Sequence, residues 1–238
     1  LTIKGNVIPT PNKLRASIGN VKLTKTKIDL NQIKNTESIG DYIEIENQYQ
    51  QPLAVVLPSY PEYFRFEAQP STLKPGEKGK LFFYIDGSKK KEFGKFTDRV
   101  EIRFEFANTV KSGYLYFNGS LNQDFSGWTR EQLQSAPELT LDQNTLDAAD
   151  LKIGEVKAMD INIGNSGHSP LLIHNVQTER ECRLLTYPEQ LQPGEEGIIS
   201  IALEPSVPRK TFNTTLRIIS NDPAHPEQVV RIKGNIGT

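Results

Sequence analysis

Leu191-Gln-Pro-Gly-Glu-Glu-Gly197 is a stretch that the chain contains twice, because Leu73-Lys-Pro-Gly-Glu-Lys-Gly79 matches it at five of seven positions. The glycines that follow the two prolines lie 118 residues apart, about the length of one β-sandwich domain. Proline followed by glycine is typical of a tight turn, and an apolar run follows each copy. The pair therefore predicts a duplicated turn that leads into a core strand of each of two domains.

Other residues recur at nearly the same spacing, which indicates that the whole chain is duplicated and not the turn alone. The recurring pairs are Asn47 with Asn165, Pro52-Leu53 with Pro170-Leu171, and Phe96 with Phe212, at spacings of 118, 118 and 116 residues.

The two ends of the chain also resemble each other, because Leu1-Thr-Ile-Lys-Gly-Asn-Val7 has a near twin in Val230-Arg-Ile-Lys-Gly-Asn-Ile236. A capping-box pattern, Thr129-Arg-Glu-Gln132, predicts a short helix between the halves. We expect the last strand of a preceding repeat over residues 1–9, one domain over 10–122, a linker over 123–133 and a second domain over 134–238.

Between these markers, apolar and polar residues alternate with a period of two, which predicts half-buried strands. Val100, Ile102, Phe104 and Phe106 alternate with charged residues, and the aromatic run Phe82-Phe83-Tyr84 is assigned to a strand as well. No long amphipathic helix pattern is present. The predicted fold class is all-β, with two tandem immunoglobulin-like antiparallel β-sandwiches.

A series of motifs in the second half resembles a known family. The motifs are Asn165-Ser-Gly-His-Ser-Pro-Leu-Leu-Ile173, the Leu191–Gly197 stretch, Phe212, Ser220-Asn-Asp-Pro223 and Ile232-Lys-Gly-Asn-Ile236. They resemble the bacterial immunoglobulin-like domains of unknown function in the ASPM/Hydin and major-sperm-protein-like group. The resemblance covers nearly all of residues 134–238, with a more degraded copy over 20–121.

This resemblance implies tandem sandwiches, export across the inner membrane and a source among Bacteroidetes-type bacteria, and it implies no catalysis. The family commonly carries a Cys-Gly-Cys cluster after its Pro-Leu strand. Here Glu181-Cys182-Arg183 keeps one cysteine, and the first copy has Phe64 at that place. We therefore expect Cys182 to fill a core position.

Composition narrows the function further. The net charge of −1 argues against non-specific binding to nucleic acid, although residues 1–122 carry +5 and residues 123–238 carry −6. The single cysteine allows no intrachain disulfide. The three histidines lack partners at metal-ligand spacing, and no Gly-x-Ser-x-Gly elbow is present. We expect no enzymatic activity, no cofactor and no metal.

The candidate partner-binding residues lie in two loops of the first half. Ser59-Tyr-Pro-Glu-Tyr-Phe64 places Tyr60, Tyr63 and Phe64 together, and loop tyrosines are good contact residues. They could equally cap the end of the sandwich. Gly87–Lys95 is expected to be an exposed basic hairpin with Lys89, Lys90 and Lys91, which could also serve only to protect a strand edge.

The expected function is that of a non-catalytic, extracytoplasmic spacer or protein-binding module, located in the periplasm or at the cell surface. Its partner would be another protein of the cell envelope, and any membrane contact would run through an anchor upstream of Leu1. Two alternatives stay open: glycan binding through the aromatic residues of the first domain, and a periplasmic chaperone that donates a strand to its client. The final strand, expected to be short and broken at Gly234, argues against the chaperone.

Overall fold

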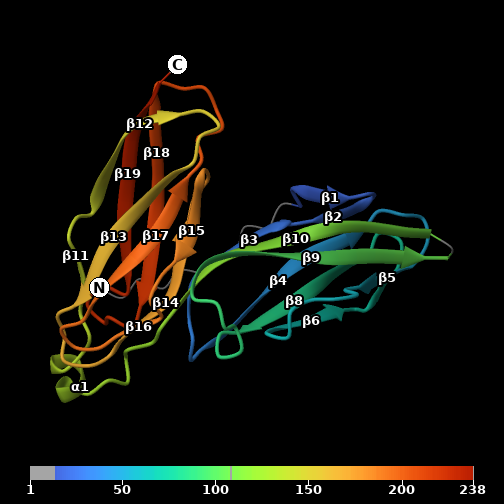
Figure 1. Ribbon diagram of the computed structural model, residues 1–238. Coiled ribbons are helices and arrows are strands. Elements are labelled where there is room, and N and C mark those ends of the chain that lie inside the picture. Colours follow the sequence, from blue (N-terminus) through green and yellow to red (C-terminus); the bar gives the residue numbers. More distant parts are fainter. Residues whose placement is uncertain (1–13, 108, 238) are drawn as a thin grey trace, which may run out of the picture. The chain divides into compact units, whose positions relative to one another are not determined.

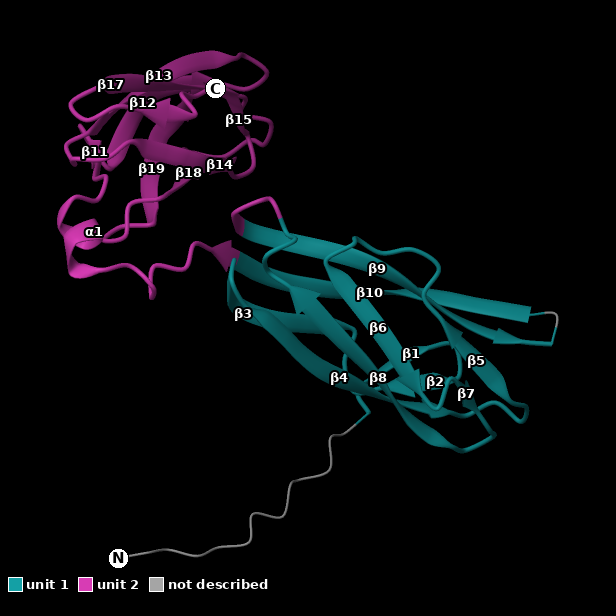
Figure 2. Cartoon of the chain, turned by 90° about the horizontal axis from the view of Figure 1, so that it is seen from below, with its two compact units in different colours: residues 1–90, 95–120 teal, residues 91–94, 121–238 magenta. Residues whose placement is uncertain are grey.

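The computed structural model describes residues 14–107 and 109–237 and confirms the all-β prediction (Figure 1). The remnant strand expected over residues 1–9 lies outside the described residues. The chain divides into two compact units (Figure 2). Among the described residues, unit 1 comprises 14–90 and 95–120, and unit 2 comprises 91–94 and 121–237.

Unit 1 is a sandwich of two five-stranded sheets. The strand orders are β1-β2-β4-β8-β6 and β3-β10-β9-β5-β7. The strands are β1 (Ala16–Ile18), β2 (Val21–Leu23), β3 (Lys27–Lys34), β4 (Ser38–Asn47), β5 (Leu53–Val56), β6 (Phe64–Gln69), β7 (Thr72–Leu73), β8 (Lys78–Asp86), β9 (Gly94–Phe106) and β10 (Thr109–Asn122).

Unit 2 repeats this arrangement with sheets β11-β13-β17-β15 and β12-β19-β18-β14-β16. Each strand takes the place of its unit 1 counterpart, and only β1 has none. The strands are β11 (Leu139–Leu141), β12 (Thr145–Lys152), β13 (Lys157–Asn165), β14 (Leu171–Thr178), β15 (Cys182–Thr186), β16 (Gln190–Leu191), β17 (Glu196–Leu203), β18 (Thr211–Ser220) and β19 (Glu227–Gly237).

The duplicated stretch that predicted the fold is a type II turn in both units. Gly76 and Gly194 have φ angles of 72° and 78°, which the third position of this turn requires and which glycine adopts without strain. Glu195 N donates to Gln192 O at 2.9 Å, closing the turn, and Glu77 N does the same to Lys74 O at 3.0 Å. The turn therefore belongs to the scaffold.

A buried asparagine fastens each turn to the preceding strand. Asn165 N donates to Glu195 O at 3.0 Å, and Gly194 N donates to Asn165 O at 2.8 Å. The Asn165 side chain donates to Ser169 O and Leu191 O, and its Oδ1 accepts from Gly167 N. Asn47 makes the equivalent bonds in unit 1, with Nδ2 donating to Gln51 O, Leu73 O and Lys74 O.

The core of each unit follows the alternation seen in the sequence. In unit 1 the largest fully buried side chains are Phe83, Phe104 and Phe117, and in unit 2 the largest is Phe212. Cys182 is buried in the unit 2 core, which confirms its expected packing role. Burial raises the pKa of its thiol to about 11, because the thiolate loses solvation.

The helix α1 (Arg130–Gln134) precedes the first strand of unit 2. Thr129 caps it, accepting from Gln132 N, and Gln132 Oε1 accepts from Thr129 N, which is the capping box that the sequence indicated. No helix in the described part of the chain is long and apolar enough to cross a membrane.

Candidate functional site

The structure brings the two candidate loops together at one end of unit 1. Lys90 Nζ lies 3.0 Å from Tyr63 Oη and 3.5 Å from Asp98 Oδ2. It also lies 4.4 Å from the Tyr63 ring centroid and 4.1 Å from the Phe96 ring centroid. We call this set of four residues the lysine clamp, because one cation joins the segment before β6 to the segment after β8.

Two expectations about these loops were wrong. Lys90 is only 6% exposed and Phe64 only 4% exposed, so neither is a surface contact in the free chain. Phe64 opens β6 and packs against Phe117, which makes it a core residue. Lys90 is drawn inward because the carboxylate of Asp98 and two aromatic faces replace part of its hydration.

The remaining candidates differ in what they offer to a partner. Tyr60 is 39% exposed, although its ring packs edge-on against Phe66 at 4.9 Å between centroids. Lys89 is exposed and forms only a long ion pair of 3.9 Å with Asp86. Lys91 is exposed but belongs to unit 2, so it cannot be assigned to the same surface.

Unit 2 has an equivalent clamp with different chemistry. Glu181 stands where unit 1 has Tyr63, and Arg209 pairs with it while lying 5.3 Å from the Phe212 ring centroid. Glu204 N donates to Glu181 O at 2.9 Å, as Asp86 N does to Tyr63 O. Bonds from the Ser206 backbone and from Arg209 lower the pKa of Glu181 to about 2.

A pocket of about 920 Å³ lies beside the unit 2 clamp. Its walls include Arg180, Glu181, Ser206 and Arg209. The Glu181 carboxylate is fully engaged, because it also accepts from Ser206 N and Oγ. The groups here are satisfied by one another, which is the pattern of a structural ion pair.

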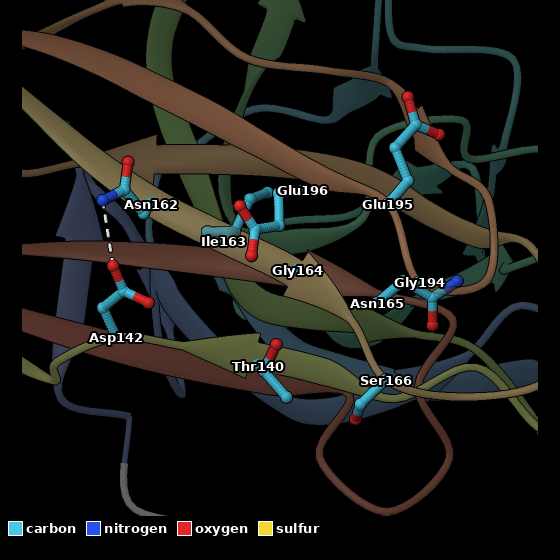
Figure 3. Close-up of a pocket in the computed structure, with 10 residues that line it drawn as sticks. All are labelled: Thr140, Asp142, Asn162, Ile163, Gly164, Asn165, Ser166, Gly194, Glu195 and Glu196. Atoms are coloured by element: carbon cyan, nitrogen blue, oxygen red, sulfur yellow. Dashed lines mark hydrogen bonds between the residues drawn. The ribbon is translucent and has the colours of Figure 1, made fainter.

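A second, polar pocket of about 370 Å³ lies next to the duplicated turn of unit 2 (Figure 3). Asp142, Glu195 and Glu196 line it, and Asn162 Nδ2 donates to Asp142 Oδ2 at 2.9 Å. Glu195 caps the turn by accepting from Gln192 N at 2.7 Å. A pocket of about 440 Å³ recurs beside the unit 1 turn with different side chains, so this hollow follows from the turn itself.

Within residues 14–107 and 109–237, no group of three or more histidine, cysteine, aspartate or glutamate residues could hold a metal ion. The protonated thiol of Cys182 is buried among apolar side chains, which is the opposite of an activated nucleophile.

An aromatic surface that the sequence did not reveal lies on the outer face of the sheet β1-β2-β4-β8-β6. Tyr42 on β4 pairs with Phe82 on β8, and Gly40 pairs with Tyr84. Tyr84 is 43% exposed, and Tyr42 and Phe82 are partly exposed. We call Tyr42, Phe82 and Tyr84 the aromatic face.

A signal for this face was present in the alternation. Phe82, Phe83 and Tyr84 are consecutive, and successive side chains of a strand point to opposite sides. Since Phe83 is buried in the core, its two neighbours must face outward. Their assignment to a strand is confirmed, but assignment to a strand does not place a side chain in the core.

Comparison with known proteins places the fold and leaves the activity open. Residues 139–236 match the family described as "Protein of unknown function (DUF1573)". No curated protein matches the chain. A protein of unknown function from Porphyromonas gingivalis W83 has 18% sequence identity and a TM-score of 0.66, and the match covers 91% of this chain and 100% of that one. At this identity the similarity concerns the fold alone.

Two further structural matches are too weak to support any inference about this chain. The periplasmic chaperone SfaE has 10% identity and a TM-score of 0.34, over 91% of this chain and 100% of that one. The PapD-like domain 7 of human CEP192 has 11% identity and a TM-score of 0.35, over 52% of this chain and 98% of that one.

Proposed function

We propose that this chain is a non-catalytic, tandem immunoglobulin-like module of a bacterial envelope that binds another protein through the loop end of unit 1. The loop end comprises the exposed Tyr60 and Lys89, which would touch the partner, and Tyr63 and the buried Lys90, which hold the two loops together. The extracytoplasmic location and the grouping with the ASPM/Hydin and major-sperm-protein-like domains are parts of this proposal, and they rest on the motif resemblance.

The observation that carries the proposal is the lysine clamp. Because Lys90 ties the loop before β6 to the loop after β8, Tyr60 and Lys89 are presented by a backbone that is already ordered. Binding then costs less conformational entropy than it would with free loops, because these loops are ordered before the partner arrives. Tyrosine is enriched in protein interfaces relative to the rest of the surface.

The strand-donating alternative cannot rest on the final strand. β19 is continuous from Glu227 to Gly237, and Gly234 pairs with Phe212, so the expected break at Gly234 was wrong. The strand lies between β12 and β18, and both of its edges are therefore hydrogen-bonded within the sheet. A strand in that position cannot be donated to a client without dismantling unit 2.

Capture from an envelope fraction tests the proposal. Immobilised chain carrying Tyr60→Ala or Lys89→Glu should lose most of a partner that the unchanged chain retains, with an unaltered Tm. Tyr114→Ala is the matched control, because Tyr114 is similarly exposed, at 41%, but lies on the other sheet. Equal capture by all three variants would exclude the loop end.

A further inference from the structure

The aromatic face of unit 1 has no counterpart in unit 2, although the two sheets share their strand order. Tyr42 pairs with Phe82 where unit 2 pairs Asp160 with Ser200, and Gly40 pairs with Tyr84 where unit 2 pairs Ala158 with Ala202. The fold therefore tolerates small and polar residues at these positions. Within unit 1 the rings also pack on their neighbours, Tyr84 over Gly40 and Tyr42 against Phe82. Unit 2 forms the same sheet without such rings, so the sandwich itself does not require them.

Polar groups alternate with the rings on this face. Arg65 pairs with Tyr84, Glu67 with Phe82, and Gln69 with Lys80 on the neighbouring strands β6 and β8. Lys80 Nζ lies 4.1 Å from the Tyr42 ring centroid, and Arg65 Cζ lies 5.5 Å from that of Tyr84. Tyr84 and Tyr42 thus each have a cation as a neighbour, and Phe82 has a carboxylate.

A pocket of about 440 Å³ continues the face along β8. Its walls include Glu44, Gln69 and Lys80 around a floor at Ile45 and Gly79. Gly40 extends the flat region at the other end, because a Cβ there would stand 2.8 Å from the Tyr84 ring. Ring, polar group and pocket therefore follow one another on a single side of the sheet.

This pattern differs from the core of a protein interface. Such cores exclude charge and bury a compact, fully desolvated aromatic cluster. Here Tyr42 and Phe82 pack against each other at 5.8 Å between ring centroids, and charged side chains, among them Arg65 at 74% exposed, flank the rings. Same-face neighbours in a sheet lie about 5 Å apart across strands and about 7 Å apart along one, which is close to the size of one sugar ring. A pyranose offers an apolar C–H face to an aromatic ring and hydroxyl groups to the polar side chains around it.

We infer that the aromatic face binds a polysaccharide, with pyranose rings lying on Phe82 and Tyr84 and hydroxyl groups hydrogen-bonded by Glu44, Gln69 and Lys80. The surface is separate from the loop end, so the chain would hold a glycan and a protein partner by different residues. Failure of one proposal leaves the other standing.

Affinity electrophoresis of the full chain tests this inference. Native gels containing a soluble β-glucan, an α-mannan or polygalacturonate should retard the chain in at least one case. The triple variant Tyr42→Asp, Phe82→Ser, Tyr84→Ala should abolish the retardation, and its substituted residues are those that unit 2 carries at the same places. Tyr114→Ala should be retarded like the unchanged chain, and circular dichroism should show all variants folded.

Three outcomes would overturn the inference. They are migration unaffected by every polysaccharide, retardation that survives the triple substitution, and loss of a captured protein in the triple variant with no retardation by any glycan. The last outcome would make the face a protein contact.

Discussion

The turns around Asn47 and Asn165 have nearly the same structure in the two units. The outer faces of the neighbouring sheets differ, because only unit 1 carries aromatic side chains at the matched positions. Both asparagines are buried, and both hold a Pro-Gly turn by the same set of backbone bonds. On these faces, unit 1 has Tyr42, Phe82 and Tyr84 at the positions where unit 2 has Asp160, Ser200 and Ala202. The two copies keep the same asparagine, proline and glycine in these turns and differ in the residues of the outer faces. The function of the chain is therefore expected to depend on the positions that differ.

The asparagine turn should give the largest effect, and the same effect in both units. Asn165→Ala removes a side chain that satisfies two buried carbonyls and accepts from backbone N–H groups, which should cost about 4 kcal/mol of unfolding free energy. Asn47→Ala should cost a similar amount in unit 1. Urea unfolding followed by amide hydrogen exchange in each unit measures both, and a loss below about 1 kcal/mol in either would break the equivalence.

Removal of the cation from each clamp should destabilise the two units to different extents. Lys90→Met leaves the Asp98 carboxylate without its cation, and the Lys90 and Asp98 side chains are 4% and 18% exposed. We expect a loss of about 3 kcal/mol. Arg209 is 33% exposed, and Arg209→Met should cost about 1 kcal/mol because water can replace part of the ion pair. Thermal unfolding of the two variants compares them, and an equal cost would show that the clamps are interchangeable.

Acid should act on the unit 2 clamp through Glu181, the residue that takes the place of Tyr63 in unit 1. Since the pKa of Glu181 is about 2 in the folded chain and 4.5 in the unfolded one, this carboxylate contributes stability above pH 4.5 and loses it as pH falls toward 2. Glu181→Gln should flatten the dependence of unit 2 stability on pH in that window. Tyr63 in the equivalent place carries no carboxyl group, so Tyr63→Phe should leave the acid limb of unit 1 unchanged.

The smallest effect concerns Cys182, whose counterpart in unit 1 is Phe64. With its pKa raised to about 11, the thiol should react with iodoacetamide at pH 8 about 100-fold more slowly than an ordinary cysteine. Urea should restore the ordinary rate. A fast reaction in the native chain would mean that Cys182 is reached by solvent and does not share the packing role of Phe64.

The sequence predicted the parts of the molecule that depend on local chemistry. Pro193 and Gly194 favour a type II turn through their own backbone preferences, and the alternation around Val100 predicts a strand with one buried face. The burial of Lys90 could not be predicted in the same way. It depends on Tyr63, 27 residues earlier, and on Asp98 in the next strand, and no periodicity relates these three positions.

The aromatic face was also only partly predictable from the sequence. Alternation shows that Phe82 and Tyr84 share a side, but only the pairing of β4 with β8 places Tyr42 beside them. The sequence indicated a tyrosine loop and a lysine loop as separate features. The sequence did not predict that these two loops lie side by side, nor that Phe64 and Lys90 are buried. Both facts became visible only in the folded structure.

The duplicated turn has a consequence for engineering the charge of either unit. The copy at Leu73–Gly79 carries two lysines and a glutamate, whereas the copy at Leu191–Gly197 carries two glutamates. Lys74, Lys78 and Glu196 are exposed, and the bonds that close each turn come from the backbone and from Glu77 or Glu195. The seven residues thus form an interchangeable cassette. Exchanging the copies would move three units of charge from one sandwich to the other while leaving both backbones as they are.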